Sequence, residues 1–199
     1  MFNTLFNTKG ALAAALLATV MSAPAQATSV NVTTDGSWYQ FDADEFISNS
    51  GGLEWIDAIT DDAGHYSGDG SALSFTFTLN QAGTLTVVDG GFAGDEYLIT
   101  VNGVDHLSSS LVQPSLENVG TNFDTALTDG GFSYLTLALN PGTYTVTGLL
   151  HVSAADPFGN PYNASVGGLR VSEVPVPAAV WLLGSGLLAF ATRMRRRRA

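Results

Sequence analysis

Acidic side chains gather in two short, glycine-rich stretches of this chain, where they are spaced to bind a cation. In the first stretch, 60–70, Asp61, Asp62 and Asp69 surround His65. Carboxylates on a loop of this kind suit Ca²⁺, which takes about six to eight oxygen ligands. The spacing is not that of an EF-hand, because the glutamate that closes an EF-hand loop is missing. We therefore expect either a Ca²⁺ site or a solvated turn.

The second acidic stretch contains Asp89 and Asp95, with Glu96 next to them and two glycines after Asp89. It is a second candidate Ca²⁺ site. The alternative is that both aspartates accept hydrogen bonds from backbone amides of the turn, as aspartate commonly does. Thiolate metal sites and disulfides are excluded, because the chain has no cysteine.

Residue patterns of known catalytic centres are absent from the sequence. His65, His106 and His151 lack the spacing of a zinc site, and no Gly-x-Ser-x-Gly motif, phosphate loop or dinucleotide fingerprint occurs. A glycosidase needs two carboxylates about 5–9.5 Å apart, but among 18 acidic residues some pair meets that distance by chance. We expect a non-enzymatic protein and keep a secreted hydrolase with an acidic pair as a minor hypothesis.

Six aromatic residues fall outside the regular strand patterns and could stack on sugar rings if exposed: Trp38, Tyr39, Trp55, Tyr66, Phe158 and Tyr162. Trp38 and Trp55 are expected in the core, because large aromatic side chains are usually buried. Tyr66 and Tyr162 fall in expected loops and are the candidates for ligand stacking. A carbohydrate-binding β-sandwich with structural Ca²⁺ is therefore the alternative function.

Alternating apolar and polar residues predict the β-strands that would position these side chains. The clearest alternation covers Leu73–Leu79, Tyr97–Val101 and Leu135–Leu139, and Asn102–Gly103 predicts a type I′ hairpin. Other predicted strands cover 30–33, 37–41, 53–59, 85–87, 104–107, 144–152 and 168–173, with a helical turn at 44–47 and loops at 113–131 and 154–164. Short strands between turn residues favour an all-β fold, a single antiparallel β-sandwich of jelly-roll type.

The N-terminal residues 1–27 have the three parts of a secretory signal peptide. Lys9 supplies the positive charge, and 11–21 is an apolar stretch too short to span a bilayer. Ala25 and Ala27 form a small-x-small cleavage site, so we expect the mature chain to begin at Thr28.

The C-terminal residues 174–199 combine a proline motif, an uncharged stretch and a basic cluster. The 17 uncharged residues 176–192 would form a helix about 26 Å long, at the short end of what spans a bilayer. The arginines resist translocation, so the helix would run with its N-terminal end outside the cytoplasm. The motif residues are Val174, Pro175, Val176 and Pro177, and the stop-transfer arginines are Arg193, Arg195, Arg196, Arg197 and Arg198.

This tail resembles the PEP-CTERM sorting signal of Gram-negative bacteria that make extracellular polysaccharide. Family members carry the run Val-Pro-x-Pro-Ala-Ala-x-Trp-Leu-x-x-Ser-Gly-Leu, which residues 174–187 match, although Val176 stands where the motif's name has glutamate. The middle of the chain, 84–103, loosely resembles ectodomains of the same family. The resemblance implies recognition, and cleavage near the prolines, by an exosortase-like membrane enzyme, followed by display at the cell surface or in a polysaccharide matrix.

Between the two termini lies an acidic body at 28–173. It contains all 18 acidic residues but only one basic residue, Arg170, a net charge of −17. Such a surface repels nucleic acid and anionic lipid, so no nucleic-acid partner is expected. A body of this size can bury a single core without disulfides, and we expect one domain.

Overall fold

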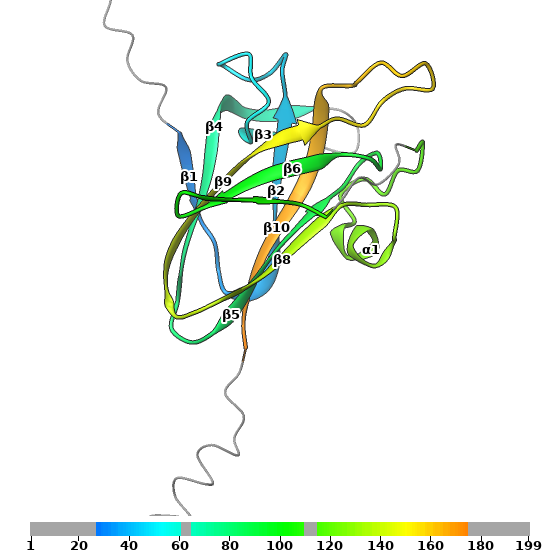
Figure 1. Cartoon of the computed structure of the whole chain (residues 1–199). Helices are drawn as coiled ribbons and strands as arrows, with labels where there is room; N and C mark the ends of the chain where they lie inside the picture. Colours follow the sequence, from blue (N-terminus) through cyan, green and yellow to red (C-terminus); the bar gives the residue numbers. More distant parts are fainter. Residues whose placement is uncertain (1–26, 61–64, 110–114, 175–199) are drawn as a thin grey trace, which may run out of the picture.

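The alternating segments form ten strands in the computed structural model, which describes residues 27–60, 65–109 and 115–174 (Figure 1). One short helix, α1, accompanies them. The elements are β1 Thr28–Asn31, β2 Asp35–Asp44, β3 Ile56–Thr60, β4 Tyr66–Leu79, β5 Gly83–Asp89, β6 Glu96–Val101, β7 Val104–Leu107, α1 Phe123–Thr128, β8 Tyr134–Leu139, β9 Gly142–Val152 and β10 Ala164–Glu173.

The strands form one strongly folded sheet in the order β7-β6-β9-β4-β3-β2-β10-β5-β8. The long strand β4 belongs to two layers, because its first part pairs with β3 and its second part with β9. Neighbours along this order are antiparallel, whereas β1 pairs parallel with β4, a departure from the purely antiparallel sheet that we predicted. The sheet nearly closes, because Ser109, just after β7, donates its backbone N–H to the carbonyl oxygen of Tyr134 in β8 at 2.6 Å.

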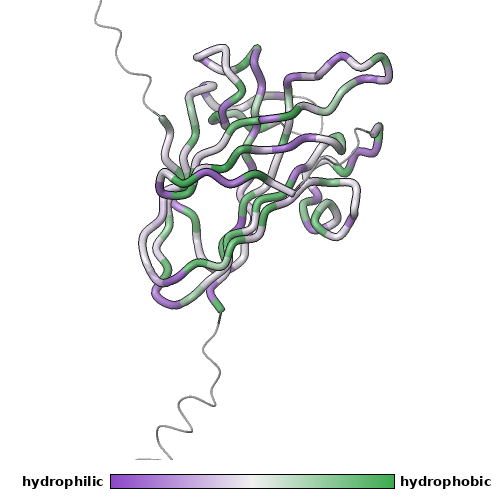
Figure 2. Tube along the Cα trace, in the orientation of Figure 1, coloured by the Kyte–Doolittle hydropathy of each residue, from purple (hydrophilic) through white to green (hydrophobic). Residues whose placement is uncertain are grey.

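The core lies between the layers and includes the apolar residues of the predicted alternation in Leu73–Leu79 and Tyr97–Val101, whereas Leu135, Leu137 and Leu139 pack against it only partly buried. Figure 2 shows apolar and polar residues alternating along the strands. At its centre Phe41 stacks on Trp55 with 3.9 Å between ring centroids, and Tyr97 and Phe75 meet these rings edge-on. Trp55 is fully buried, as predicted. Gly148 gives it room, because a Cβ at that position would lie 2.4 Å from the Trp55 ring.

A second, smaller cluster fixes α1 against the sheet. Phe123 and Ala126 of the helix pack with Val88, Ala93 and Phe132. We predicted a loop throughout 113–131, and α1 corrects that prediction. Because the helix has only six residues, it is too short to produce a helical periodicity in the sequence.

The turns follow the predicted chemistry. Asn102 and Gly103 have φ angles of 48° and 82°, as a type I′ turn requires, and join β6 to β7. A single turn follows Asp44, whose carbonyl oxygen accepts the backbone N–H of Ser48 at 2.9 Å. Strand β4 begins at Tyr66, seven residues before the predicted strand, because Gly68 and Gly70 obscure its alternation.

The two ends of the folded body lie at opposite ends of the sandwich (Figure 1). Strand β1 begins at Thr28 and β10 ends at Glu173. Within the described residues no helix is long and apolar enough to cross a membrane. Apart from Ala27 and Val174, the signal peptide 1–27 and the sorting segment 174–199, with its predicted helix at 176–192, lie outside the described residues.

Candidate functional site

Two of the predicted acidic residues, Asp89 and Asp95, lie close together inside the sandwich. Asp89 is the last residue of β5 and Asp95 directly precedes β6, so the two aspartates flank the short connection 90–94 between these strands. Both residues are buried, at 0% and 2% exposure. The Asp95 Oδ1 accepts the backbone N–H of Ala154 at 2.6 Å. The Asp89 Oδ2 is buried without a hydrogen-bond partner.

Tyr97 and Ser165 complete this buried cluster. The Tyr97 hydroxyl contacts the Ser165 Oγ, and it also lies 3.2 Å from the Val166 carbonyl oxygen and 3.5 Å from the Asp89 Oδ1. From the sequence we predicted Tyr97 only as a strand residue and assigned Ser165 no part in this site. No signal in the sequence connects Ser165 to Tyr97 and Asp95, because their contacts depend on how β10 pairs within the sheet.

The environment of the pair favours the protonated form. Burial, followed by the neighbouring charge of Asp95, raises the pKa of Asp89 to about 9. Burial raises the pKa of Asp95 to about 6, although hydrogen bonds from the Ala154 amide and from Ser165 oppose the rise. Two carboxylates this close and this buried cannot both ionise cheaply, so they share a proton at neutral pH. The same burial, with the acidic neighbours Asp89, Asp95 and Asp42, raises the pKa of Tyr97.

In the described part of the chain, the acidic residues predicted to bind Ca²⁺ do not form a group that could hold a metal ion. No group of three or more His, Asp or Glu side chains in residues 27–60, 65–109 and 115–174 is arranged to hold a metal ion. Asp69 is exposed in β4, where its Oδ1 accepts the backbone N–H of Ser71 at 2.9 Å. Asp61 and Asp62 lie outside the described residues. At Asp89 and Asp95, burial and the raised pKa values favour a shared proton over Ca²⁺.

The two tyrosines predicted to stack on a ligand differ in position. Tyr66 is not in a loop, as we predicted, but begins β4 and pairs with Thr60. Tyr162 is in the loop before β10 and is 36% exposed. Its ring stacks on that of Phe92, with 5.5 Å between centroids and 24° between planes.

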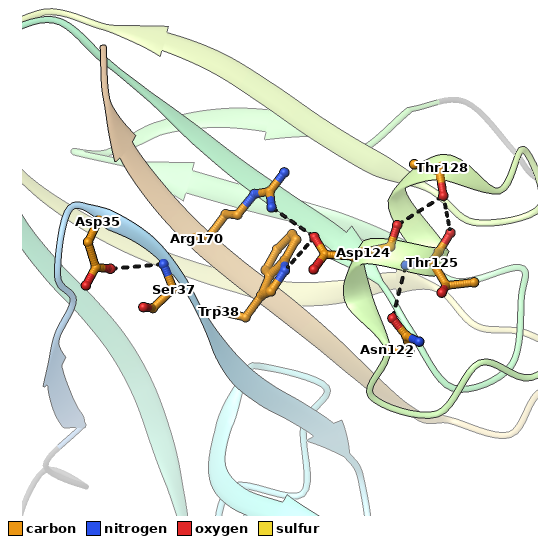
Figure 3. Close-up of polar contacts among 8 residues, drawn as sticks. All are labelled: Asp35, Ser37, Trp38, Asn122, Asp124, Thr125, Thr128 and Arg170. Atoms are coloured by element: carbon orange, nitrogen blue, oxygen red, sulfur yellow. Dashed lines mark hydrogen bonds and ion pairs between the residues drawn. The ribbon is translucent and has the colours of Figure 1, made fainter. Parts of the chain in front are cut away.

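The single basic residue of the acidic body fastens α1 to the outside of the sheet (Figure 3). The Arg170 guanidinium lies 4.4 Å from the centre of the Trp38 ring, and its Nη1 is 3.0 Å from the Asp124 Oδ1. The Trp38 Nε1 donates to the same oxygen at 3.1 Å. Trp38 is half-buried on the outer face of the sheet, where its ring packs on Phe123 of the smaller cluster, and it does not lie in the main core. Arg170, Trp38 and Asp124 contact one another, so we interpret this cluster as a structural contact that holds α1 against the sheet.

Comparisons with known proteins identify no family. No family model and no curated protein matches the chain. Distant likenesses among solved structures include the pre-peptidase C-terminal domain of a collagenase from Bacillus anthracis, at 10% identity and a TM-score of 0.36, covering 75% of this chain and 98% of that one. They also include PliG of Aeromonas hydrophila, a periplasmic inhibitor of g-type lysozyme, at 17% identity and a TM-score of 0.32, covering 74% and 96%.

A third is CorA, a surface-associated copper-binding protein of Methylomicrobium album BG8, at 10% identity and a TM-score of 0.37, covering 74% and 98%. We draw no functional conclusion from scores this low.

Proposed function

We propose that this chain is an exported, non-enzymatic protein, sorted through its C-terminal segment and displayed at the cell surface or released from it. The observation that carries this proposal is the position of the first and last strands of the described residues. Strand β1 starts at Thr28, directly after the expected signal cleavage site, and β10 stops at Glu173, directly before the proline motif.

The hydrogen bonds at both ends of the described body are made by residues that lie between the two expected cleavage sites. The Thr28 Oγ1 lies 2.8 Å from the Ser71 Oγ, and β1 is in register with β4 from Thr28 onward. At the other end, the Glu173 Oε1 accepts the Asn80 backbone N–H at 2.7 Å, and Val174 donates its backbone N–H to Ala82 at 2.9 Å. Cleavage after Ala27 and after Val174 would leave these bonds intact.

The buried carboxylates support a non-enzymatic role. A glycosidase needs one carboxyl group with a raised pKa beside a second one, both within reach of a substrate. Asp89 and Asp95 have the raised pKa values, but both lie inside the sandwich, where no sugar reaches them. Burial within the fold is therefore sufficient to explain their raised pKa values without a catalytic role.

The finer parts of the proposal rest on the sequence. The tail 174–199 supports a transient membrane helix and an exosortase-like partner, and a destination in polysaccharide follows from the PEP-CTERM resemblance alone. The position of β10 between β2 and β5 supports a jelly-roll-like arrangement of the sandwich, since neighbouring strands come from distant parts of the chain.

Protease accessibility in a Gram-negative host tests the proposal. In spheroplasts that produce the full chain with a tag after Ala199, added protease should digest the acidic body and leave the tag protected. Changing the five tail arginines to glutamine should expose about half or more of the tag, because positive residues hold a segment on the cytoplasmic side. Arg170→Gln, which changes one charge in the body, is the matched control and should keep the tag protected. A wild-type chain found wholly in the cytosol with residues 1–27 attached would contradict the proposal.

A further inference from the structure

Three loops meet at the end of the sandwich that lies opposite the end of β10 (Figure 1). The strand register places them together, because Asp44 pairs with Ala164 and Asp89 pairs with Gly167. Strand β9 ends at the same side, since Val152 pairs with Glu96. We call the loops 45–55, 90–95 and 153–163 together the distal tip.

The distal tip exposes four aromatic rings. Phe46 and Phe158 are 86% and 90% exposed, which is unusual for phenylalanine. Phe92 and Tyr162 form the exposed stacked pair described above. A single exposed aromatic residue needs no explanation, but four on three adjoining loops indicate an interaction surface.

Hydrogen bonds hold these loops in fixed conformations. Asp156 accepts the backbone N–H groups of Phe158 and Asn160 at 2.8 and 2.9 Å, so Phe158 lies on a braced turn. The Asp44 Oδ1 accepts the backbone N–H of Phe46 at 2.8 Å. The Asn163 side chain joins the two loops by donating to Glu45 Oε2 at 2.7 Å. Loops that are already ordered lose little conformational entropy on binding, as a recognition surface requires.

The charge of the molecule restricts the partner. A body with a net charge of −17 repels a second copy of itself, anionic lipid and polyanionic glycans. Rings distributed over separate turns also lack the continuous apolar core typical of a protein interface. Neutral sugars fit both conditions, because the C–H groups on one face of a pyranose ring carry slight positive charge and stack on the negative face of an aromatic ring.

We propose that the distal tip binds neutral polysaccharide by stacking of sugar rings on Phe46, Phe158 and the Phe92–Tyr162 pair. Glu45 precedes Phe46 and Asp156 is two residues before Phe158 in the same loops, and beyond the hydrogen bonds that they already accept, both carboxylates have oxygen lone pairs left for sugar hydroxyl groups. Binding of this kind does not depend on how the chain is exported.

Affinity electrophoresis tests this binding. The full chain, kept soluble in a polyoxyethylene detergent that contains no sugar, would be run through native gels containing dextran, mannan, galactan or xylan, or alginate as the polyanionic comparison. We expect at least one of the neutral polysaccharides to retard the protein and alginate not to. The double variant Phe46→Ala/Phe158→Ala should weaken the retardation about tenfold or more, since each lost stack contributes severalfold.

Matched variants separate stacking from general apolarity. Phe158→Tyr keeps an aromatic ring and should retain binding. Val104→Ala truncates a residue that is 58% exposed on β7, away from the tip, and should bind like the wild type. Retardation by none of the neutral polysaccharides, equal retardation by alginate, or unchanged retardation of the double variant would each overturn the proposal.

Discussion

Asp89→Asn should stabilise the protein relative to the wild type by an amount that grows as the pH rises from mildly acidic to alkaline. In the folded protein the pKa of Asp89 is raised to about 9, whereas in the unfolded chain it returns to about 3.8. Between these values the folded state holds a proton that the unfolded state has released. The stabilisation is therefore complete below the unfolded pKa and is lost as the pH rises towards 9.

Asparagine is neutral at every pH and has nearly the shape of a protonated aspartate. We expect the advantage of the variant over the wild type to grow by about 2 kcal/mol or more between pH 5 and pH 9, which corresponds to about 4–8 °C or more in Tm. Asp105→Asn, a change of an exposed aspartate on β7, should produce no such pH dependence. Thermal melts of the full-length chain in detergent at pH 5, 7 and 9 provide the measurement. An equal loss of stability for Asp89→Asn at all three pH values would contradict the shared proton.

Gly148→Ala should strongly destabilise the sandwich, although it adds a single methyl group. The added Cβ would lie 2.4 and 2.5 Å from two atoms of the fully buried Trp55 ring. That ring is stacked on Phe41 and cannot move away without disturbing the centre of the core. Overpacking of this kind costs about 1–3 kcal/mol, which corresponds to a fall in Tm of about 2–12 °C.

A double-mutant cycle shows whether the clash is the cause. Trp55→Phe removes part of the ring that the methyl group would meet, so the double variant should be more stable than the sum of the two single changes by about 1 kcal/mol. Gly130→Ala is the control, because a Cβ there meets open space, and its Tm should stay close to that of the wild type. Strict additivity of Gly148→Ala and Trp55→Phe would show that the ring is not what excludes the methyl group.

Local patterns were sufficient to predict most of the fold. The alternation in Leu73–Leu79 and Tyr97–Val101 predicts strands whose apolar residues are indeed buried, and Asn102–Gly103 predicts the turn that joins β6 and β7. Local patterns do not determine which strands pair with one another in the sheet. The parallel pairing of β1 with β4 and the place of β10 between β2 and β5 connect residues far apart in the sequence.

The site was predictable only in part for the same reason. Asp89 and Asp95 were recognised as a pair because they are close in sequence, but their burial depends on strands from elsewhere in the chain. Long-range packing also moved Trp38 to the outer face, where Arg170 covers it. Phe46 and Phe158 were not singled out as a pair, because what distinguishes them is exposure at one end of the sandwich, a property of the assembled fold.

The intact mass of the protein recovered from its native host tests the central claim most directly. Export followed by sorting predicts a chain that begins at Thr28 and ends between Val174 and Ala178, so that the recovered protein is little more than the body from β1 to β10. A mass that includes residues 1–27, measured on protein from the cytoplasm, would contradict the account.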